Sequence, residues 1–354
     1  MLMKITQRLN AGVARRYYSE EKLEENKVFE VWGNLEVPFG RPITWTDSKY
    51  LFKGKHPDTH EQLTRIMKGK RRSGADLTFV APKTVSILWG LANDNDREII
   101  ETIHRDAVKD GLSVLSERAV YVKRNKGELV YHGGFLFHHG MTRSRDPHLH
   151  THAYLLNIGF VDSSRVWRAL DVDVRWSHAA RDTYMLSLSW GLASHGVVLS
   201  SVGRYFEVDL TKPLVDIFSK GKELFVKHGL DKESWKYFKR KKDLSLDFSR
   251  LRTRWISQAI GTGFDIGSIR LVKTSSMPSV VNTSTVLASA GTFRHAGKLW
   301  SVAIKTGGLG RTNLDEVKKA VSELEPKIFN LGRNILRTND KNISKDRTYE
   351  RIKS

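Results

Sequence analysis

The residues from 148 to 155 follow a strict two-residue alternation, which is the period of a β-strand. Histidines at 148, 150 and 152 and Tyr154 alternate with Leu149, Thr151, Ala153 and Leu155. Because a strand sends successive side chains to opposite faces, His150 and His152 must point to the same side of a sheet. Three histidines at this spacing are expected by chance in only about one chain in fifty of this composition. The pattern therefore predicts a strand that concentrates imidazoles on one face.

A second strand-like segment, Leu129 to Phe137, lies just upstream and is followed by His138 and His139. Between the two segments, residues 140–147 form a turn-rich loop that carries Arg143. If one strand folds back on the other, His138 or His139 comes to lie beside the His150/His152 pair. Three converging imidazoles can hold a metal ion and leave coordination positions open for a substrate. The alternative is a strand whose histidines face solvent or bond to carboxylates.

The charge balance points to a polyanionic partner. The 354 residues include 59 Lys and Arg against 39 Asp and Glu, a net charge of +20. Such an excess favours nucleic acid over a small-molecule substrate. Cysteine is absent, so any metal must be held by His, Asp or Glu and a thiol nucleophile is excluded. No apolar run approaches the eighteen or so residues that span a bilayer, so we expect no membrane insertion and a cytoplasmic protein.

Two basic clusters are candidate nucleic-acid contacts. The first ends at Arg71 and Arg72, and the second, 236–242, contains Tyr237 and Phe238 and follows Trp235. Aromatic rings among Lys and Arg suit single-stranded nucleic acid, whose bases stack on rings while its phosphates meet the cations. The alternatives are a solvated helix end and an ordinary amphipathic loop. Lys83, just after a predicted strand, is a further candidate contact.

Strands and helices are mixed along the chain without regular βαβ alternation. Strands are predicted at 2–5, 76–80 and 119–122, the last pairing with 129–137 as a hairpin, and helices at about 99–115, 175–195 and 311–330. Residues 31–50 carry Gly, Pro and Asp and are predicted to form loop and turn. This organisation favours an α+β fold with an antiparallel sheet and packed helices.

Three residues outside the histidine segment complete a plausible chemistry. Tyr17 and Tyr18 follow two arginines near the N-terminus, and Asp76 opens a buried-looking strand. Tyrosine can act as a nucleophile on a phosphodiester when a nearby base or cation assists, since only about a tenth of a per cent is phenolate at pH 7. Asp76 is a candidate for that base or for orienting a metal-bound histidine. Each residue also has an ordinary structural explanation, as a packed aromatic or a strand-edge carboxylate.

In combination, these segments resemble a known family. DPHLHTHAYLLN with the upstream FHHGMTRSR, ADLTFVAPKTVS at 75–86 and the N-terminal RRYY are similar to the MobF (TrwC/TraI-type) conjugative relaxases, which are HUH endonucleases. The similarity extends over roughly residues 1–265 and includes the WRAL segment at 167–170. It implies an HUH, palm-like antiparallel sheet and an enzyme that nicks and rejoins one DNA strand at a plasmid origin of transfer.

The resemblance also implies roles for individual residues. Tyr17 matches the nucleophile that forms a 5′-phosphotyrosyl intermediate, with Tyr18 beside it, and Asp76 matches the acidic residue behind the site. His139, His150 and His152 match the metal ligands, which resolves the choice between His138 and His139 and leaves His148 out. The implied cofactor is a divalent ion, Mg²⁺, Mn²⁺ or Zn²⁺. Candidate DNA contacts are Arg143, which matches an arginine near the scissile phosphate, together with Lys83, Arg71 and Arg72.

The chain departs from the family pattern in two respects. Residues 19–49 contain no tyrosine, so a second tyrosine acting after the first is not expected, and no Walker motif is present. We therefore expect a relaxase domain at 1–270, a poorly patterned and partly helical tail at 271–354, and reliance on a separate helicase and on coupling or relaxosome proteins, or else a truncated copy. The competing hypotheses are a catalytically decayed, basic single-stranded-DNA-binding protein and a zinc-dependent hydrolase of a small phosphoester.

Overall fold

The computed structural model divides the chain into two compact units. It describes residues 3–8, 30–65, 72–122, 128–142, 145–202, 205–219, 247–275, 278–290 and 295–336, with side chains for all of these except 3–8, 290 and 327–336. The first unit comprises residues 1–102, 121–171 and 207–271, and the second comprises 103–120, 172–206 and 272–354. Each unit is therefore assembled from segments far apart in the sequence.

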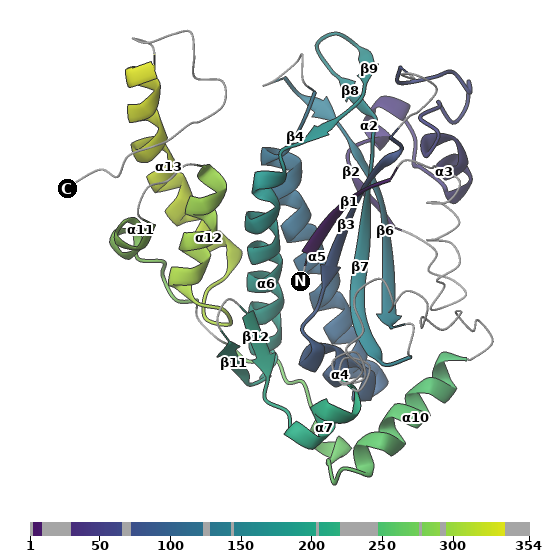
Figure 1. Ribbon diagram of the computed structural model, residues 1–354, viewed down its shortest axis with the longest axis vertical. Coiled ribbons are helices and arrows are strands. Elements are labelled where there is room, and N and C mark those ends of the chain that lie inside the picture. Colours follow the sequence, from purple (N-terminus) through teal and green to yellow (C-terminus); the bar gives the residue numbers. More distant parts are fainter. Residues whose placement is uncertain are drawn as a thin grey trace, which may run out of the picture. The chain divides into compact units, whose positions relative to one another are not determined.

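The first unit is built on a five-stranded antiparallel sheet (Figure 1). Its strands, in sheet order, are β1 (Met3–Arg8), β3 (Gly74–Val80), β7 (Pro147–Leu156), β6 (Gly133–Met141) and β2 (Glu30–Gly33). The long central strand β7 is the predicted histidine strand, and β6 folds back on it as expected. The structure thus has the predicted α+β class with an antiparallel sheet.

The predicted hairpin between 119–122 and 129–137 is wrong. The upstream segment forms β4 (Val120–Tyr121), which pairs with β10 (Asp171–Val172). The downstream segment is interrupted at His132, and its first part, β5 (Val130–Tyr131), joins β8 (Gly159–Val161) and β9 (Val166–Arg168) in a separate three-stranded sheet. Strands that are neighbours in sequence often pair, but here each segment pairs with a strand farther along the chain.

The prediction of loop and turn for residues 31–50 is also wrong. This stretch contains β2, α2 (Glu36–Phe39) and the start of α3 (Trp45–Leu51). A capping box begins α3: the Thr44 hydroxyl accepts from the Asp47 backbone N–H, and the Asp47 carboxylate accepts from the Thr44 N–H. Apolar side chains of this stretch and of the residues that follow it pack against the sheet face that carries Phe135, Phe137 and Tyr154. These side chains are Leu35, Ile43, Leu51, Phe52 and Leu63. Burial against the sheet overrides the local turn signals.

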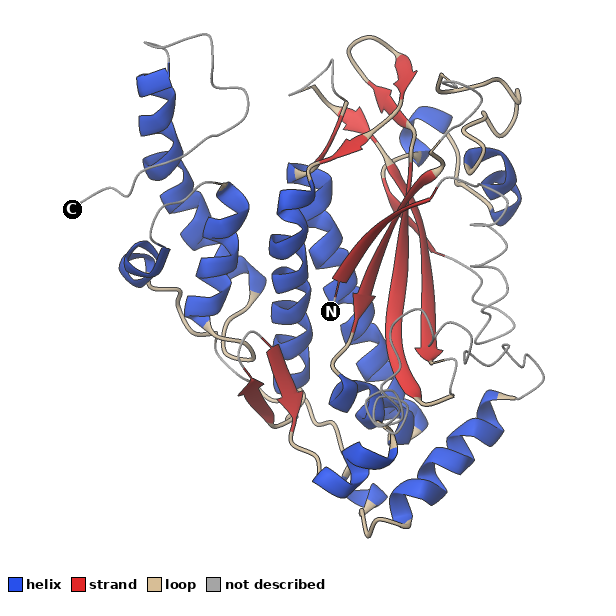
Figure 2. Ribbon diagram, in the orientation of Figure 1, coloured by secondary structure: helices blue, strands red, loops and turns tan. Residues whose placement is uncertain are grey.

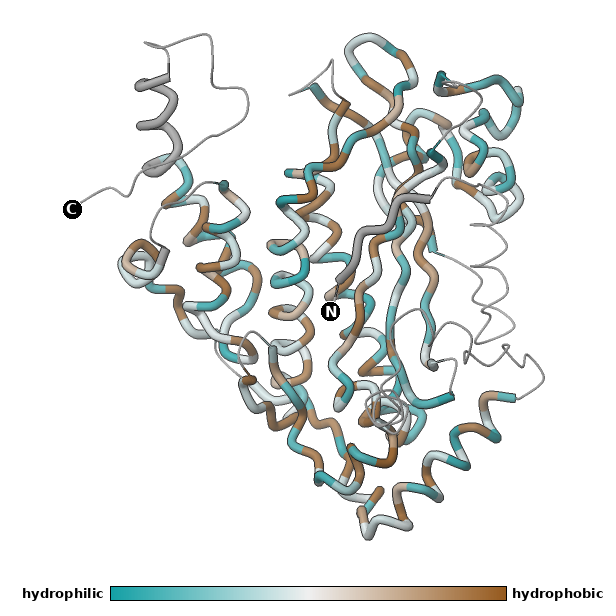
Figure 3. Tube along the Cα trace, in the orientation of Figure 1, coloured by the Kyte–Doolittle hydropathy of each residue, from teal (hydrophilic) through white to brown (hydrophobic). Residues whose placement is uncertain are grey.

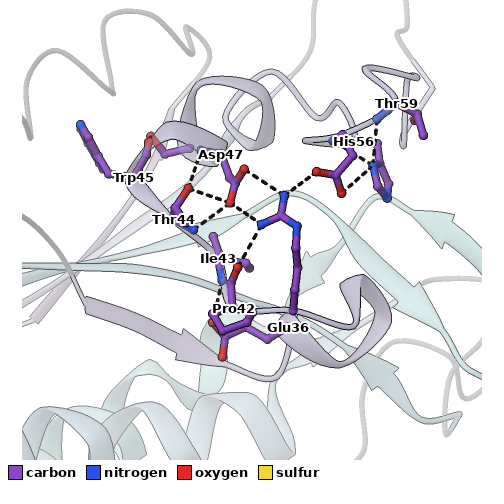
Figure 4. Close-up of polar contacts among 11 residues, drawn as sticks. Glu36, Pro42, Ile43, Thr44, Trp45, Asp47, His56 and Thr59 are labelled. Carbon is purple, nitrogen blue, oxygen red and sulfur yellow. Dashed lines mark hydrogen bonds and ion pairs between the residues drawn. The ribbon is translucent and has the colours of Figure 1, made fainter.

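Arg41 bonds to two carboxylates within the segment that packs against the sheet (Figure 4). The Arg41 guanidinium donates to both carboxylate oxygens of Asp47, at 2.8 and 3.1 Å, and to Asp58 at 2.6 Å. The Glu36 carboxylate accepts from the Ile43 backbone N–H at 2.8 Å. Asp47 is 8% exposed, and its bond to Arg41 lowers its pKa to about 2. The ionised carboxylate therefore contributes to the stability of the fold.

The first testable prediction concerns this carboxylate. Because the pKa of Asp47 is lower in the folded state than its usual value near 3.9, its stabilising effect is complete above about pH 4 and is lost as the pH falls towards 2. Asp47→Asn should lower the free energy of unfolding by about 1 kcal/mol at pH 7, since Arg41 is partly exposed to solvent. In urea titrations between pH 7 and pH 3, the free energy of unfolding of Asp47→Asn should fall less on acidification than that of the wild type. Glu98→Gln, at an exposed position of helix α5 (Asp94–Arg118), should retain the wild-type profile.

Helices flank the sheet within the first unit (Figure 2). They are α4 (Lys83–Leu91), the first part of α5 (Asp94–Arg118), α7 (Lys212–Ile217) and α10 (Phe248–Ile260), with a 3₁₀ turn, η2 (Ile266–Ser268). α4 packs against β7, where the Ser86 hydroxyl accepts from the Leu149 backbone N–H at 3.0 Å. α10 alternates hydrophobic and hydrophilic residues along its length, as Figure 3 shows. One face of α10 is thus available to bury apolar surface.

The second unit is mainly helical. It contains the second part of α5, η1 (Val174–Trp176), α6 (Ser177–Ala193), α11 (Thr283–Ala290), α12 (Ala296–Gly307) and α13 (Leu314–Leu336), and the ladder of β11 (Leu199–Val202) and β12 (Tyr205–Val208) begins there. α12 packs on α6, where the Trp300 indole N–H donates to the Thr183 hydroxyl at 2.8 Å. Within the described ranges, no helix has the length and hydropathy required to cross a bilayer. The division at 270 between a relaxase domain and a tail stays a prediction.

Candidate metal centre

Strand register brings three histidines together on one face of the sheet. His139 of β6 lies opposite His150 of β7, and Phe137 lies opposite His152, so all three imidazoles share the face that further along carries Phe135 and Tyr154. The ring centroids of His139, His150 and His152 are 5.0, 5.2 and 5.3 Å apart in pairs. One nitrogen from each ring lies within 4.8 Å of the others, and all three residues are buried. This geometry can hold a metal ion on neutral imidazole nitrogens.

Asp76 and Thr78, both on β3, fix the orientation of His152. Asp76 Oδ1 lies 2.9 Å from His152 Nδ1, and the Thr78 hydroxyl lies 3.2 Å from the same nitrogen. Thr78 is the register partner of His152, and Asp76 is only 1% exposed. A carboxylate that accepts a hydrogen bond from Nδ1–H leaves the lone pair on Nε2, where it can bind a metal. Such a carboxylate is the usual outer partner of a metal-bound histidine. Asp76 therefore lies where the sequence placed it, behind the histidines.

His150 is oriented by the backbone. Its Nδ1 lies 2.8 Å from the His148 carbonyl oxygen, so Nδ1 carries the proton and Nε2 offers its lone pair. Burial lowers the pKa of His139 to about 3 and lowers the pKa of His150 well below its usual value. The imidazoles of His139 and His150 are consequently neutral at pH 7, which is the protonation state that binds metal ions.

The two other histidines of the segment lie differently. His138 points to the opposite face, where its Nδ1 is 2.8 Å from the Thr151 hydroxyl and its Nε2 is 3.5 Å from a Glu30 carboxylate oxygen. His148 lies on the histidine face, 4.6 Å from His150 between ring centroids, and burial lowers its pKa to about 4. In the part of the chain that the structure describes, the group with converging ligand atoms contains His139, not His138 or His148. The structure thus brings together the residues expected as ligands.

The remaining predicted residues are less closely placed or lie outside the described ranges. The Lys83 ammonium donates to the Pro147 carbonyl oxygen at 2.9 Å, and burial lowers its pKa. The Arg72 guanidinium donates to the Leu170 carbonyl oxygen at 2.9 Å and lies 3.7 Å from Asp171. Both cations are therefore bonded within the protein. Tyr17, Tyr18, Arg71 and Arg143 lie outside the described residues.

Two residues that contribute to the site were not predicted. Thr78 follows Asp76 by two positions on the same strand, so the period-two pattern could have identified it as a second partner of the histidines. Trp255 of α10 donates its indole N–H to the Arg145 carbonyl oxygen in the β6–β7 turn at 2.8 Å. Trp255 and Arg145 are 110 residues apart in the sequence, so no local sequence pattern could predict their contact.

Comparison with known proteins places the chain in a family. The model of the TrwC relaxase family matches residues 5–244. The chain belongs to the TrwC relaxase family. The conjugative relaxase TrwC in complex with oriT DNA, in its metal-bound structure, has a TM-score of 0.64 at 26% identity, covering 75% of this chain and 99% of that one. TrwC complexed with a 27-mer DNA of the recognition hairpin and cleavage site gives a TM-score of 0.62 at 26% identity, with the same coverage.

Sequence relatives in the TrwC relaxase family include longer proteins. The multifunctional conjugation protein TraI of Escherichia coli strain K12 is 29% identical over 184 residues, which are 49% of this chain and 10% of TraI. A second Escherichia coli TraI is 33% identical over 130 residues, 35% of this chain and 7% of that protein. The chain therefore spans about a tenth of the length of the curated relatives it matches.

A carboxylate substitution tests the orientation of His152. Asp76→Asn keeps the shape of the side chain but removes the charge that stabilises the proton on Nδ1. Outer partners of this kind typically contribute tenfold to a hundredfold to metal affinity, so we expect about tenfold weaker Mn²⁺ binding by isothermal titration calorimetry. Asp182→Asn removes a carboxylate that pairs with Arg181 on α6 and should leave Mn²⁺ binding within about twofold. Equal Mn²⁺ affinity in Asp76→Asn and the wild type would contradict the assigned role.

Proposed function

We propose that the protein is a DNA relaxase that nicks and rejoins one strand at a plasmid origin of transfer. The observation that carries this proposal is the buried group of His139, His150 and His152 with Asp76 behind it, in a chain of the TrwC relaxase family. The net charge of +20 supports a polyanionic substrate. No feature of the site favours catalytic decay, since the three histidines and the acidic residue behind them are intact.

The proposed reaction is a transesterification by Tyr17. Its phenolic oxygen attacks the scissile phosphorus, a P–O bond to tyrosine forms, and the P–O3′ bond breaks. The phenol proton passes to a base, and the 3′ oxygen takes up a proton as it leaves. The 5′ end remains on the tyrosine, and the reverse reaction with a 3′ hydroxyl rejoins the strand. Because one phosphodiester is exchanged for another, no external energy source is required.

The histidine group suits a divalent cation. His139, His150 and His152 would hold it, since their nitrogens converge and burial keeps the imidazoles of His139 and His150 neutral. When bound, Mg²⁺, Mn²⁺ or Zn²⁺ supplies Lewis-acid polarisation of the scissile phosphate. Asp76 and Thr78 hold His152 in its ligating orientation, and the His148 carbonyl does the same for His150. We assign Arg143 to the phosphate near the scissile bond and Lys83, Arg71 and Arg72 to secondary roles along the DNA.

The proposal also defines partners and a location. The substrate is single-stranded DNA at an origin of transfer, and strand separation is supplied by a separate helicase, with coupling or relaxosome proteins delivering the complex. We place the reaction in the cytoplasm, where plasmid DNA is found. The related TrwC has been solved in complex with oriT DNA and with a 27-mer DNA that contains its recognition hairpin and cleavage site, which supports this substrate class.

The decisive experiment is a covalent-adduct assay. The protein is incubated with labelled single-stranded oligonucleotides that tile its own replicon, in Mn²⁺ or Mg²⁺, and analysed on a denaturing gel. We expect one oligonucleotide, labelled at its 3′ end, to give a protein–DNA band that carries the labelled 3′-side fragment and disappears in EDTA. Adduct formation on none of the oligonucleotides with either metal would refute the proposed activity. Binding alone would not support it, because any basic protein binds DNA in a salt-dependent manner.

A further inference from the structure

In the connection between the two strands that carry the histidines, the described residues Thr142, Arg145 and Asp146 are hydrogen-bonded to one another. The Arg145 N–H donates to the Thr142 carbonyl at 2.9 Å, and the Thr142 N–H donates to the Asp146 carbonyl at 3.0 Å. The Asp146 N–H donates to the Thr142 hydroxyl at 3.1 Å. Arg145 has a positive φ of 65°, which a residue with a side chain adopts only where its surroundings hold it. Thr142 is therefore bonded to both Arg145 and Asp146.

Helix α10 contacts this connection through Trp255. The indole N–H donates to the Arg145 carbonyl oxygen at 2.8 Å, and the side chain is 1% exposed. Leu251 and Ala259 lie one turn before and after it on the same buried face of α10. The helix is itself anchored by Arg252, whose guanidinium donates to the Ala92 carbonyl and to Asp94, both at 2.5 Å. Trp255 thus connects a fixed helix to the residue with the positive φ.

Helix α4 supports the strand ends from another direction. A Cβ atom added at Gly140 would lie 2.1 Å from the ring of Trp89, so only glycine permits β6 to approach this ring immediately after His139. Trp89 and Trp255 lie 6.2 Å apart between ring centroids. The Lys83 ammonium holds the Pro147 carbonyl at 2.9 Å, at the start of β7. The β6–β7 pairing shifts register between His139 and Met141, so the ladder itself is irregular where these contacts act.

We propose that Trp255 is a positioning residue for the metal centre. It fixes the Arg145 carbonyl and thereby the bonded group of Thr142, Arg145 and Asp146, which sets the spacing of His139 and His150 across the strand ends. The inference deepens the proposed function, because the same connection contains Arg143. It identifies α10, far from the histidines in sequence, as a part of the structure that shapes the site.

The test compares two buried tryptophans with equivalent hydrogen bonds. Trp255→Phe keeps most of the ring packing but removes the N–H that reaches the Arg145 carbonyl. Trp300→Phe is the matched control, because its N–H donates to the Thr183 hydroxyl at 2.8 Å in the helical unit. Mn²⁺ affinity by isothermal titration calorimetry and the melting temperature are measured for both variants and the wild type. We expect about threefold to tenfold weaker Mn²⁺ binding in Trp255→Phe, and binding within about twofold of wild type in Trp300→Phe.

The outcomes separate positioning from general stability. If both variants lose similar thermal stability but only Trp255→Phe loses Mn²⁺ affinity, the positioning role holds. Unchanged Mn²⁺ affinity in Trp255→Phe would overturn it, whatever its melting temperature. If Trp255→Phe does not fold, Thr142→Val decides the question: it removes the hydroxyl that accepts from Asp146, and unchanged affinity there overturns the proposal. Weaker Mn²⁺ binding in Trp255→Phe with no nicking by the wild type would retain the positioning role and refute the proposed function instead.

Discussion

Replacing Tyr17 with phenylalanine is expected to abolish the covalent protein–DNA adduct. The substitution removes the oxygen that we propose attacks phosphorus and keeps the ring, so the reaction would lose its nucleophile. We expect a fall of about a thousandfold or more in the single-turnover nicking rate, with oligonucleotide binding within about twofold of wild type. The measurement is a quenched time course with an end-labelled oligonucleotide, alongside fluorescence anisotropy for binding.

Tyr18→Phe is the matched control for this prediction. The two tyrosines are adjacent, so the control introduces the same chemical change one residue away. We expect Tyr18→Phe to retain nicking within about tenfold of wild type, because the resemblance assigns the attack to Tyr17. Loss of the adduct in Tyr18→Phe with retention in Tyr17→Phe would exchange the two roles. Retention in both variants would exclude this tyrosine pair as the source of the nucleophile.

Replacing any one of the three clustered histidines with alanine is expected to remove metal binding at the site. The variant site keeps two of the three histidine ligands. Losing one ligand should weaken Mn²⁺ binding by about a hundredfold or more, which exceeds the loss expected from removing an outer partner such as Asp76. Nicking should fall with metal occupancy and should be partly restored at high Mn²⁺ concentration. Isothermal titration calorimetry and the adduct assay on His139→Ala, His150→Ala and His152→Ala provide the measurement.

His138→Ala controls for the general effect of losing a histidine from β6. His138 is adjacent to His139 in sequence but bonds to Thr151 on the opposite face of the sheet. We expect His138→Ala to bind Mn²⁺ within about threefold of wild type. If His138→Ala and His139→Ala weakened the metal equally, the register that selects His139 would not describe the site in solution.

The period-two pattern of 148–155 specified the strand and the shared direction of His150 and His152 before any fold was known. It could not choose between His138 and His139, because a shift of one residue in pairing exchanges the two faces of a strand. In the observed register His139 lies opposite His150, so His139 and not His138 shares a face with His150 and His152. Asp76 was identified as a candidate by its position on a buried strand, whereas its bond to His152 depends on β3 lying next to β7.

Predictions failed where local signals competed with burial. In residues 31–50 the breakers Gly, Pro and Asp indicated loop, yet Leu35, Ile43 and Leu51 pack against the sheet and shape the segment around them. The Thr44–Asp47 capping box was present in the sequence and marked the start of a helix. The hairpin predicted from 119–122 and 129–137 failed because β4 pairs with β10. The downstream segment is divided between β5, which pairs with β8, and β6, which pairs with β7 and β2.

The sequence by itself determined the α+β class, the histidine strand, a basic surface suited to nucleic acid and the absence of thiol chemistry. These features follow from side-chain periodicity, charge and composition, which are local or additive properties of the chain. The tertiary structure supplied the register that brings His139 into the group, which the residue pattern left open and only the family resemblance indicated. It alone showed that Thr78 joins Asp76 behind His152 and that Trp255 bonds to Arg145 between the ligand strands. Each of these depends on strand register or on the docking of a distant helix, and such long-range contacts are set by the burial of the whole core.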